Sequence, residues 1–289
     1  MRVKHQAPTA EIVYPAEVVT SSGTEIDMIL RSGRIAFPIG VGVATLACLV
    51  AVALLASTRL PTAAGNQSGT ALSGDDASLL DGYRHVEVAS VSDAMEKVTG
   101  KKAYMSHHMR PIFPAKFAGF AVTVLLKKEP NHDPNALDGM LAAIDQGAPN
   151  SVYVMVVEDG ADIAGMGGLM GTAMSARNFS GAVIDGGVRD VAYLQKIGFP
   201  VFGLGVVPST SVGHYRFAGA NIPVTCDGVA VSGGDVVAAD ADGVVAIPRG
   251  SAAEILKVAQ DMDFKEHSMY ATIEKLKSIV QAVKQFGRI

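Results

Sequence analysis

An arginine and an aspartate stand side by side where residues 181–190 read GAVIDGGVRD. The guanidinium of Arg189 presents a rigid fork of N–H donors that can hold a carboxylate or an enolate through two hydrogen bonds. The carboxylate of Asp190 can bind a divalent cation, directly or through water. A surface ion pair at the start of a helix is the structural alternative. The pair therefore indicates a site for a small acid beside a metal ion, or that ion pair.

A glycine-rich turn, GMGGLMG at residues 165–171, leads into a second expected helix. Glycines let the backbone approach a ligand, and free N–H groups at a helix N-terminus favour an anion. The turn is not a nucleotide fingerprint, because it has no P-loop lysine and no correctly spaced acid. Turns of this kind gather at the carboxyl ends of strands in open α/β sheets. We therefore expect both turns to bind one small 2-oxo acid chelated to a divalent metal, with the metal and the arginine stabilising the enolate.

Apolar runs that alternate with helical segments predict one mixed α/β domain with a layered ββα architecture. Strands are expected at residues 117–126, 151–157, 181–185 and 201–206, with a Gly-Gly turn at 186–187. Helices are expected at residues 90–98, where Ser90 or Ser92 is the candidate N-cap, at 136–146, after the turn up to 177, and at 191–197. Short valine-rich runs from 224 to 245 predict strands and tight turns, and residues 252–286 predict a helical tail.

A segment without charge, Ile35 to Thr58, precedes this domain. A helix of that length covers the ~30 Å hydrocarbon core of a bilayer. It predicts either an uncleaved transmembrane helix or, if translation starts at Met28, a cleaved signal peptide. The arginines before it outnumber those after it, which favours an inner-membrane protein with the soluble domain on the periplasmic side, or a secreted one after cleavage. We expect residues 1–34 to be poorly ordered, 59–77 to be a linker and 78–289 to be the α/β domain.

Composition and residue spacing argue against several other classes of protein. The chain has 289 residues, 49% of them hydrophobic, and a net charge of −4 without a long basic run, so no nucleic-acid partner is expected. Its two cysteines, Cys48 and Cys226, lie too far apart to indicate a disulfide framework. The pair His107 and His108 lacks zinc spacing and is interpreted as part of an ordinary loop.

Residues 78–287 resemble the RraA-like family, which includes class II 4-hydroxy-4-methyl-2-oxoglutarate aldolases, also oxaloacetate decarboxylases, and regulators of ribonuclease E. The resemblance rests on the two turns and on stretches in the same order: VSDA (91–94), IFP (112–114), GFAVT (119–123), FPVF (199–202), IPV (222–224) and GDVVAADADGVVAIP (234–248). It implies a fold of the swivelling-domain type and a homotrimer or hexamer with sites at subunit contacts.

The resemblance also implies roles for residues of both turns. Arg189 would bind the pyruvoyl group and stabilise the enolate. The backbone of the loop at Gly167, Gly168, Leu169 and Met170 would bind the substrate carboxylate through its N–H groups.

For the metal, the resemblance implies that Asp190 holds Mg²⁺ or Mn²⁺ through water. The family's aldolases carry a further acid that is separated from the Arg-Asp pair by twenty intervening residues, and this chain has Gly168 at that position. A glutamate from a neighbouring subunit's C-terminal helix completes their metal site, and Glu266 is the nearest candidate. The expected function is a metal-dependent lyase that cleaves a 2-oxo acid through a pyruvate enolate. The alternative is a non-catalytic RraA-like binding or regulatory protein.

Overall fold

The structure of the protein, a computed structural model, describes residues 73–287. The predicted segments 1–34 and 35–58 and linker residues 59–72 lie outside the described residues. Helix α2 (Gly74–His85) begins inside the expected linker, because the Ser73 hydroxyl accepts a hydrogen bond from the Asp76 N–H at 3.1 Å and caps the helix. The folded domain therefore starts before residue 78. Within residues 73–287, no helix is both long and apolar enough to cross a membrane.

A mixed nine-stranded sheet forms the centre of the domain, with β4 beside β5, β7 beside β2, and the main path β1-β6-β5-β3-β2-β10-β11. Its strands are β1 (Arg110–Pro111), β2 (Phe117–Lys128), β3 (Ser151–Val157), β4 (Ala164–Met166), β5 (Gly181–Val188), β6 (Val201–Val206), β7 (Tyr215–Ala220), β10 (Val236–Asp240) and β11 (Gly243–Ile247). The pairs among β2, β3, β5 and β6, and the pair of β4 with β5, are parallel. A separate hairpin joins β8 (Val224–Cys226) to β9 (Val229–Val231). The predicted mixed α/β domain is thus confirmed.

The sheet is nearly closed. Its path begins at β1 and ends at β11. Residues 111–116, at β1 and in the loop after it, line one cavity of about 550 Å³ together with Asp240 and Ala241, at the turn between β10 and β11. The two ends of the strand path therefore approach each other.

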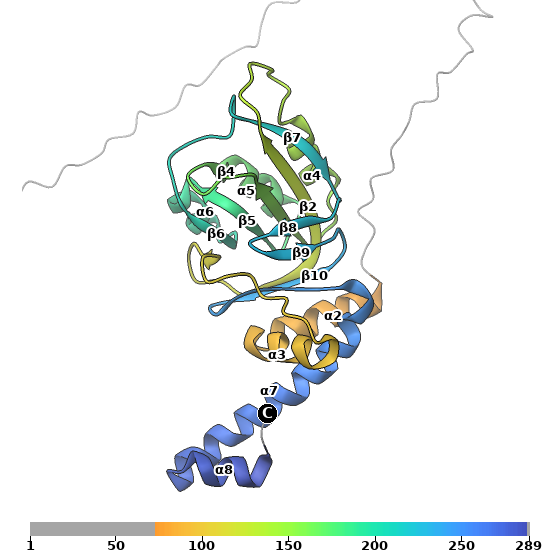
Figure 1. Cartoon of the computed structure of the whole chain (residues 1–289), viewed down its shortest axis with the longest axis vertical. Helices are drawn as coiled ribbons and strands as arrows, with labels where there is room; N and C mark the ends of the chain where they lie inside the picture. The colour runs from red at the N-terminus through yellow and green to blue at the C-terminus, as the bar shows by residue number, and fades with distance from the viewer. Residues whose placement is uncertain (1–72, 288–289) are drawn as a thin grey trace, which may run out of the picture. The chain divides into compact units, whose positions relative to one another are not determined.

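Helices cover the sheet in two groups (Figure 1). The first group packs on one face around Met155 and Ile184 and consists of α4 (Asp138–Gln146), α5 (Gly168–Ala176) and α6 (Val191–Ile197). The second packs against β10 and β11 and consists of α2, α3 (Val88–Thr99) and α7 (Ala252–Leu276), which follows the short 3-10 helix η1 (Arg249–Ser251). On the other face of the sheet, Val152 and Val154 of β3 pack with the β8–β9 hairpin. Both faces of β3 are therefore covered, as its continuous apolar run predicts.

The predicted N-cap of the helix at 90–98 is wrong. Helix α3 begins at Val88, and Ser90 lies buried inside its first turn. The Val88 N–H is satisfied by the carboxylate of Asp240, which accepts a hydrogen bond at 2.9 Å from across the domain. A helix start that is satisfied by such a distant residue carries no local sequence signal.

The predicted Gly-Gly turn at 186–187 is also wrong, because β5 continues through both glycines to Val188. Gly187 pairs with Ala164 of β4 and with Gly205 of β6. A side chain at position 187 would collide with Val207, so glycine here serves close packing of strands rather than a turn.

The expected helical tail is divided into two helices: Lys277, with φ 54°, separates α7 from α8 (Ile279–Phe286).

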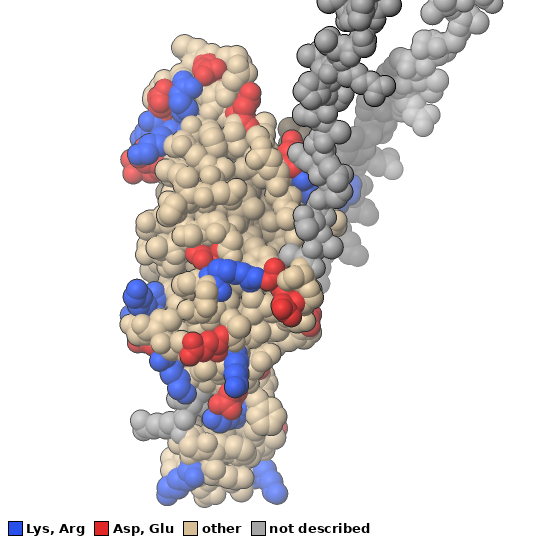
Figure 2. All heavy atoms as spheres, turned by 90° about the vertical axis from the view of Figure 1, so that its right-hand side faces the viewer, with Lys and Arg blue, Asp and Glu red and all other residues tan. Residues whose placement is uncertain are grey.

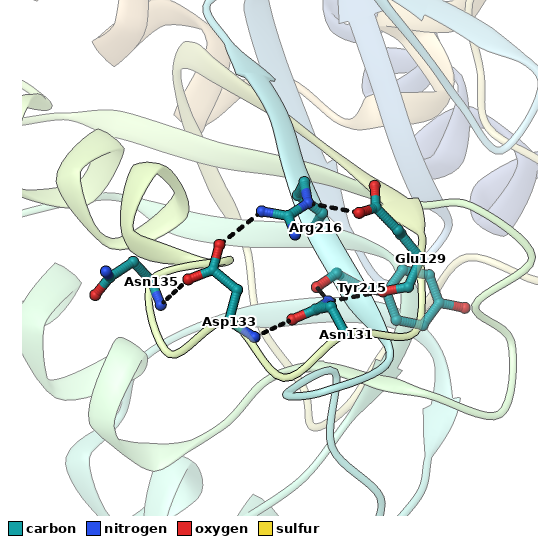
Figure 3. Close-up of polar contacts among 6 residues, drawn as sticks. All are labelled: Glu129, Asn131, Asp133, Asn135, Tyr215 and Arg216. Carbon is teal, nitrogen blue, oxygen red and sulfur yellow. Dashed lines mark hydrogen bonds and ion pairs between the residues drawn. The ribbon is translucent and has the colours of Figure 1, made fainter.

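An exposed ionic cluster fixes the loop after β2 (Figure 3). Arg216 on β7 donates to Glu129 and to Asp133, each at 2.8 Å. The hydrogen bond from Arg216 is the largest cause of a lowered pKa at the Asp133 carboxyl. Figure 2 shows charged side chains gathered over this end of the domain and in a lower band, with a broad face without Lys, Arg, Asp or Glu between them. Exposed pairs contribute little to global stability, so we assign this cluster to local ordering of the loop.

Candidate functional site

The two turns singled out in the sequence meet at one edge of the sheet. β4 leads into the glycine-rich turn and runs parallel to β5, which leads into Arg189 and Asp190. The Arg189 N–H donates to the Met166 carbonyl at 3.1 Å and ties the second turn to the first. Parallel strands that end at the same edge thus bring the turns together, as predicted.

Gly167 allows this close approach. A Cβ atom at position 167 would lie 2.6 Å from Asp190 Oδ2 and 2.9 Å from Arg189 Cγ. Both distances are shorter than van der Waals contact, so any side chain here would displace the Arg-Asp pair. The glycine at 167 is therefore required by packing within the site itself.

Asp190 adopts a left-handed backbone conformation with φ 58° at the start of α6. Its Oδ2 atom accepts a hydrogen bond from the Gly168 N–H at 2.9 Å. That N–H belongs to the first turn of α5, where backbone donors have no intrahelical partner. One oxygen of Asp190 is thus held by the neighbouring helix, which orients the carboxylate, while the side chain stays half-exposed.

Arg189 is held from the other side by a loop that the sequence did not indicate. Its Nη1 donates to the Ser209 carbonyl at 3.1 Å, and the Ser209 hydroxyl accepts from the Ala164 N–H at 2.8 Å. The loop after β6 is thereby fastened to β4. Nε of Arg189 lies 3.9 Å from Asp190 Oδ2, and the side chain is 44% exposed. A guanidinium has five donors, so most of this fork stays available to a ligand.

The first turn of α5 presents the predicted backbone donors. Residues Gly168, Leu169 and Met170 open the helix, and the Gly168 N–H is already bound to Asp190. The N–H groups of Leu169 and Met170 have no carbonyl four residues back within the helix. The Leu169 side chain is 90% exposed and Met170 is buried, so an anion here would meet backbone rather than side-chain groups.

A pocket of about 520 Å³ adjoins these groups. Gly168, Leu169 and Asp190 line it together with two residues that sequence reasoning missed, Thr172 and Tyr193. Thr172 stands one helical turn after Gly168 and Tyr193 one turn after Asp190. This i, i+4 and i, i+3 spacing was the signal that could have identified them.

Glu266 is not brought to this site within one chain. It lies on α7 and accepts a hydrogen bond from the Tyr270 hydroxyl at 2.8 Å. Figure 1 shows α7 at the end of the sheet away from α5 and α6. Across residues 73–287, no group of three or more His, Cys, Asp or Glu side chains is placed to hold a metal ion. The predicted role of Glu266 therefore depends on a second copy of the chain.

Asp185 lies four residues before Arg189, on the other side of the sheet from α5. Its Oδ2 accepts from the Asp227 N–H at 2.7 Å. Burial is the largest influence and raises the pKa of the Asp185 carboxyl above its ordinary value, and the charge of Asp227 raises it further. Ionised Asp185 is therefore less favourable in the folded state than in the unfolded chain.

We predict that Asp185→Asn stabilises the protein at neutral pH. The amide oxygen can still accept from Asp227, and the buried charge is removed. Because the folded pKa is raised, the wild type loses stability as pH rises from ~4, the unfolded value, through the folded value. Urea unfolding should thus give similar stabilities for the two proteins near pH 4 and a more stable variant at pH 7.5. A variant that is less stable at pH 7.5 would contradict this assignment.

Comparison with known proteins shows to which family the sequence is related. The sequence pattern of the RraA-like family (Aldolase/RraA) matches residues 88–246, more than half of the chain. A Halalkalibacterium halodurans protein named "Putative 4-hydroxy-4-methyl-2-oxoglutarate aldolase" is 26% identical over 62% of this chain and 80% of its own length.

Two solved structures share the fold. An uncharacterized protein of Pseudomonas syringae is 26% identical, with a TM-score of 0.66 over 72% of this chain and 94% of its own. RraAS2 of Streptomyces coelicolor, an unusual member of the RNase ES inhibitor RraA protein family, is 23% identical, with a TM-score of 0.59 over 69% of this chain and 96% of its own. The chain belongs to the RraA-like family.

Proposed function

We propose that this protein is a carbon–carbon lyase that cleaves a small 2-oxo acid through a pyruvate enolate, with a divalent metal as cofactor. The observation that carries the proposal is the convergence of the two turns: Asp190 and the first turn of α5 line one pocket, and Arg189 adjoins Asp190. Aldolase names on distant relatives support the same reaction class.

Arg189 and the first turn of α5 supply the anion-binding groups. The free N–H groups of Leu169 and Met170 suit a carboxylate, and the positive end of the helix adds to this attraction. The guanidinium of Arg189 suits the oxygen on which charge develops when the bond between C3 and C4 breaks. In a 4-hydroxy-2-oxo acid the C4 hydroxyl loses its proton, and C4 becomes the carbonyl carbon of the departing product. The electron pair of the C3–C4 bond forms the C2–C3 double bond of the enolate, which takes up a proton at C3 to give pyruvate.

The residues fit Mg²⁺ or Mn²⁺ as a largely hydrated ion. Mg²⁺ is commonly bound by one or two carboxylates with several waters and with the substrate. Asp190 provides one half-exposed carboxylate, and Gly168 provides none. A divalent ion bound there supplies Lewis-acid polarisation of the 2-oxo group. Asp190 is the residue of this chain that would hold it, with Glu266 of a second copy as the further candidate.

We further propose that the active form is a homotrimer or hexamer. The half-exposed Arg-Asp pair and the 90% exposed Leu169 leave the site open on the side where a second copy could complete it. Light scattering tests this, and a monomer in solution contradicts it. The transmembrane or signal segment at 35–58 and the periplasmic placement stay predictions.

A non-catalytic binding role is the second candidate, and the missing acid at position 168 favours it. The two candidates are separated by incubating the full chain and Mg²⁺ with 4-hydroxy-4-methyl-2-oxoglutarate or oxaloacetate and measuring pyruvate. Metal-dependent pyruvate release supports the lyase. Binding of a 2-oxo acid without pyruvate release supports the binding protein.

We predict that Gly168→Asp strengthens metal binding at least about tenfold, because hydrogen-bonding groups around a bound metal ion typically change its affinity by that factor. A Cβ atom at 168 would lie 3.5 Å from Asp190 Oδ2, so the new carboxylate stands beside the existing one. The Tyr193 ring, 3.0 Å from that Cβ, is 44% exposed and can move aside. The two carboxylates repel each other without metal. The variant should therefore melt below wild type in EDTA and gain more from Mg²⁺.

Gly168→Asn is the matched control, since it has the same size without the charge. Calorimetric titration with Mg²⁺ and melting curves in EDTA and Mg²⁺ provide the readouts. If the aspartate and asparagine variants bind Mg²⁺ equally, position 168 does not face the metal site.

A further inference from the structure

The proposed lyase site contains a pair of hydroxyl groups with no assigned role. Thr172 on α5 and Tyr193 on α6 both line the pocket beside Asp190. The Thr172 Oγ1 atom lies 3.2 Å from the Tyr193 hydroxyl and 2.8 Å from the Gly168 carbonyl. The phenol is thus held by the neighbouring helix while 44% of the residue stays exposed to the pocket and solvent.

The Tyr193 ring occupies the space toward which a side chain at position 168 would point. A Cβ atom built at 168 would lie 3.0 Å from Tyr193 Cδ1 and 3.5 Å from Asp190 Oδ2. Tyr193 and Asp190 therefore flank the same point. At this point the chain has the uncharged ring and hydroxyl of Tyr193. An acidic side chain at position 168 would instead place a negatively charged carboxylate there.

A phenolic hydroxyl recognises a different group from the one a carboxylate recognises. A carboxylate only accepts hydrogen bonds, whereas a hydroxyl both donates and accepts. Thr172 has a single proton to share between Gly168 and Tyr193. In one arrangement the Thr172 hydroxyl donates to the Gly168 carbonyl, so the Tyr193 hydroxyl donates to Thr172 and can accept a hydrogen bond from a ligand. In the other arrangement the Thr172 hydroxyl donates to the Tyr193 hydroxyl, which can then donate to the ligand. The pair thus suits a ligand hydroxyl, which also donates and accepts.

The remaining wall of this pocket is apolar. It is formed by Leu169, Val191 and Ala192. A methyl or similar small apolar group would be desolvated there favourably. Apart from Asp190, none of the side chains that line the pocket carries a charge.

We infer that Tyr193 determines specificity, by binding the C4 hydroxyl of a 4-hydroxy-2-oxo acid whose small apolar C4 substituent packs on Leu169, Val191 and Ala192. The inference rests on the proposed function, because Arg189 and α5 must hold the 2-oxo acid end. It names the residue that discriminates between the two kinds of substrate of the proposed lyase: Tyr193 favours an acid hydroxylated and branched at C4 over oxaloacetate, which has no hydroxyl at that carbon.

The test compares the full-length wild type with Tyr193→Phe, in Mg²⁺, on 4-hydroxy-4-methyl-2-oxoglutarate and on oxaloacetate. Loss of one hydrogen bond should lower kcat/KM for the hydroxylated substrate about five- to tenfold, mainly through KM. Oxaloacetate decarboxylation should stay within about twofold, because the C4 carboxylate of that substrate has no proton to donate to the phenol. Tyr104→Phe is the matched control, since Tyr104 is 46% exposed and lies outside the pocket.

A second readout does not depend on turnover. In EDTA, calorimetry compares 4-hydroxy-2-oxoglutarate with 2-oxoglutarate, which lacks only the C4 hydroxyl. Wild type should prefer the hydroxylated ligand, and Tyr193→Phe should lose that preference. Equal losses for both substrates, or an unchanged binding preference, would overturn the role of Tyr193. A wild type that neither cleaves nor binds any 2-oxo acid would instead overturn the proposed function.

Discussion

Replacing Arg189 by alanine should lower kcat/KM for pyruvate release by about 100- to 1000-fold, the range seen when a preorganised oxyanion donor is removed. Arg189 is the cation that directly follows β5, next to the pocket-lining Asp190, and Ser209 holds it there through a 3.1 Å hydrogen bond. The loss should appear mainly in kcat, because the interaction strengthens as charge develops on the enolate oxygen. Steady-state kinetics with a coupled pyruvate assay measure both constants.

Two further variants sharpen this result. Arg189→Lys keeps the charge but loses the planar fork, so it should restore only part of the activity. Arg110→Ala removes an exposed arginine of β1 that belongs to neither turn, and should leave kinetics unchanged. If Arg189→Ala retains wild-type kcat/KM, or if Arg110→Ala matches its loss, the surface ion pair is the better interpretation of Arg189.

Replacing Asp190 should have the second largest effect on activity. Different substitutions should separate its proposed role in metal binding from its structural role as acceptor for the Gly168 N–H. Asp190→Asn removes the charge but keeps an oxygen for the Gly168 N–H and a residue type that tolerates the left-handed backbone. We expect it to lose metal-dependent activity at least about tenfold, as for removal of a metal-binding group, with little loss of stability. Asp190→Ala should lose the same activity and also about 1–3 kcal/mol of stability, from the lost hydrogen bond and the left-handed strain.

Asp159→Ala is the matched control for the loss of stability that alanine causes at a left-handed backbone position. Asp159 is also left-handed, with φ 51°, and exposed, but it lies outside the pocket. This variant should share the strain penalty and keep full activity. Urea unfolding and Mg²⁺ titration provide the measurements. Should Asp190→Asn keep wild-type Mg²⁺ dependence, Asp190 would be a capping residue of α5 and not a metal ligand.

The sequence alone predicted elements whose signals are local. Ser151–Val157, Val191–Ile197 and Val201–Val206 have the expected bounds, because apolar runs and terminal glycines or prolines mark them. The start of α3 escaped prediction because Asp240, 152 residues away, satisfies its first N–H. The extension of β5 through Gly186 and Gly187 was not predicted for a related reason. Only the adjacent strands show that these glycines serve strand packing and not a turn.

The site was predictable in part for similar reasons. Arg189, Asp190 and the turn at Gly167 are contiguous motifs that follow apolar strands, so their meeting could be expected. Ser209 could not be foreseen, since only the folded loop brings its carbonyl to Arg189. Glu266 shows the converse limit: its assignment came from a resemblance, and the fold of one chain leaves it on α7 beside Tyr270.

Hydrogen exchange on pyruvate itself tests the enolate site most directly, because it needs no assumption about the aldol substrate. Pyruvate is incubated in D₂O with the full chain and Mg²⁺, and its methyl proton signal is followed by NMR. A site that stabilises the enolate should replace these protons by deuterium with the wild type, and far more slowly with Arg189→Ala or in EDTA. No exchange above the protein-free rate with the metal-loaded wild type, or equal exchange with Arg189→Ala, would contradict an enolate-forming site at Arg189 and Asp190.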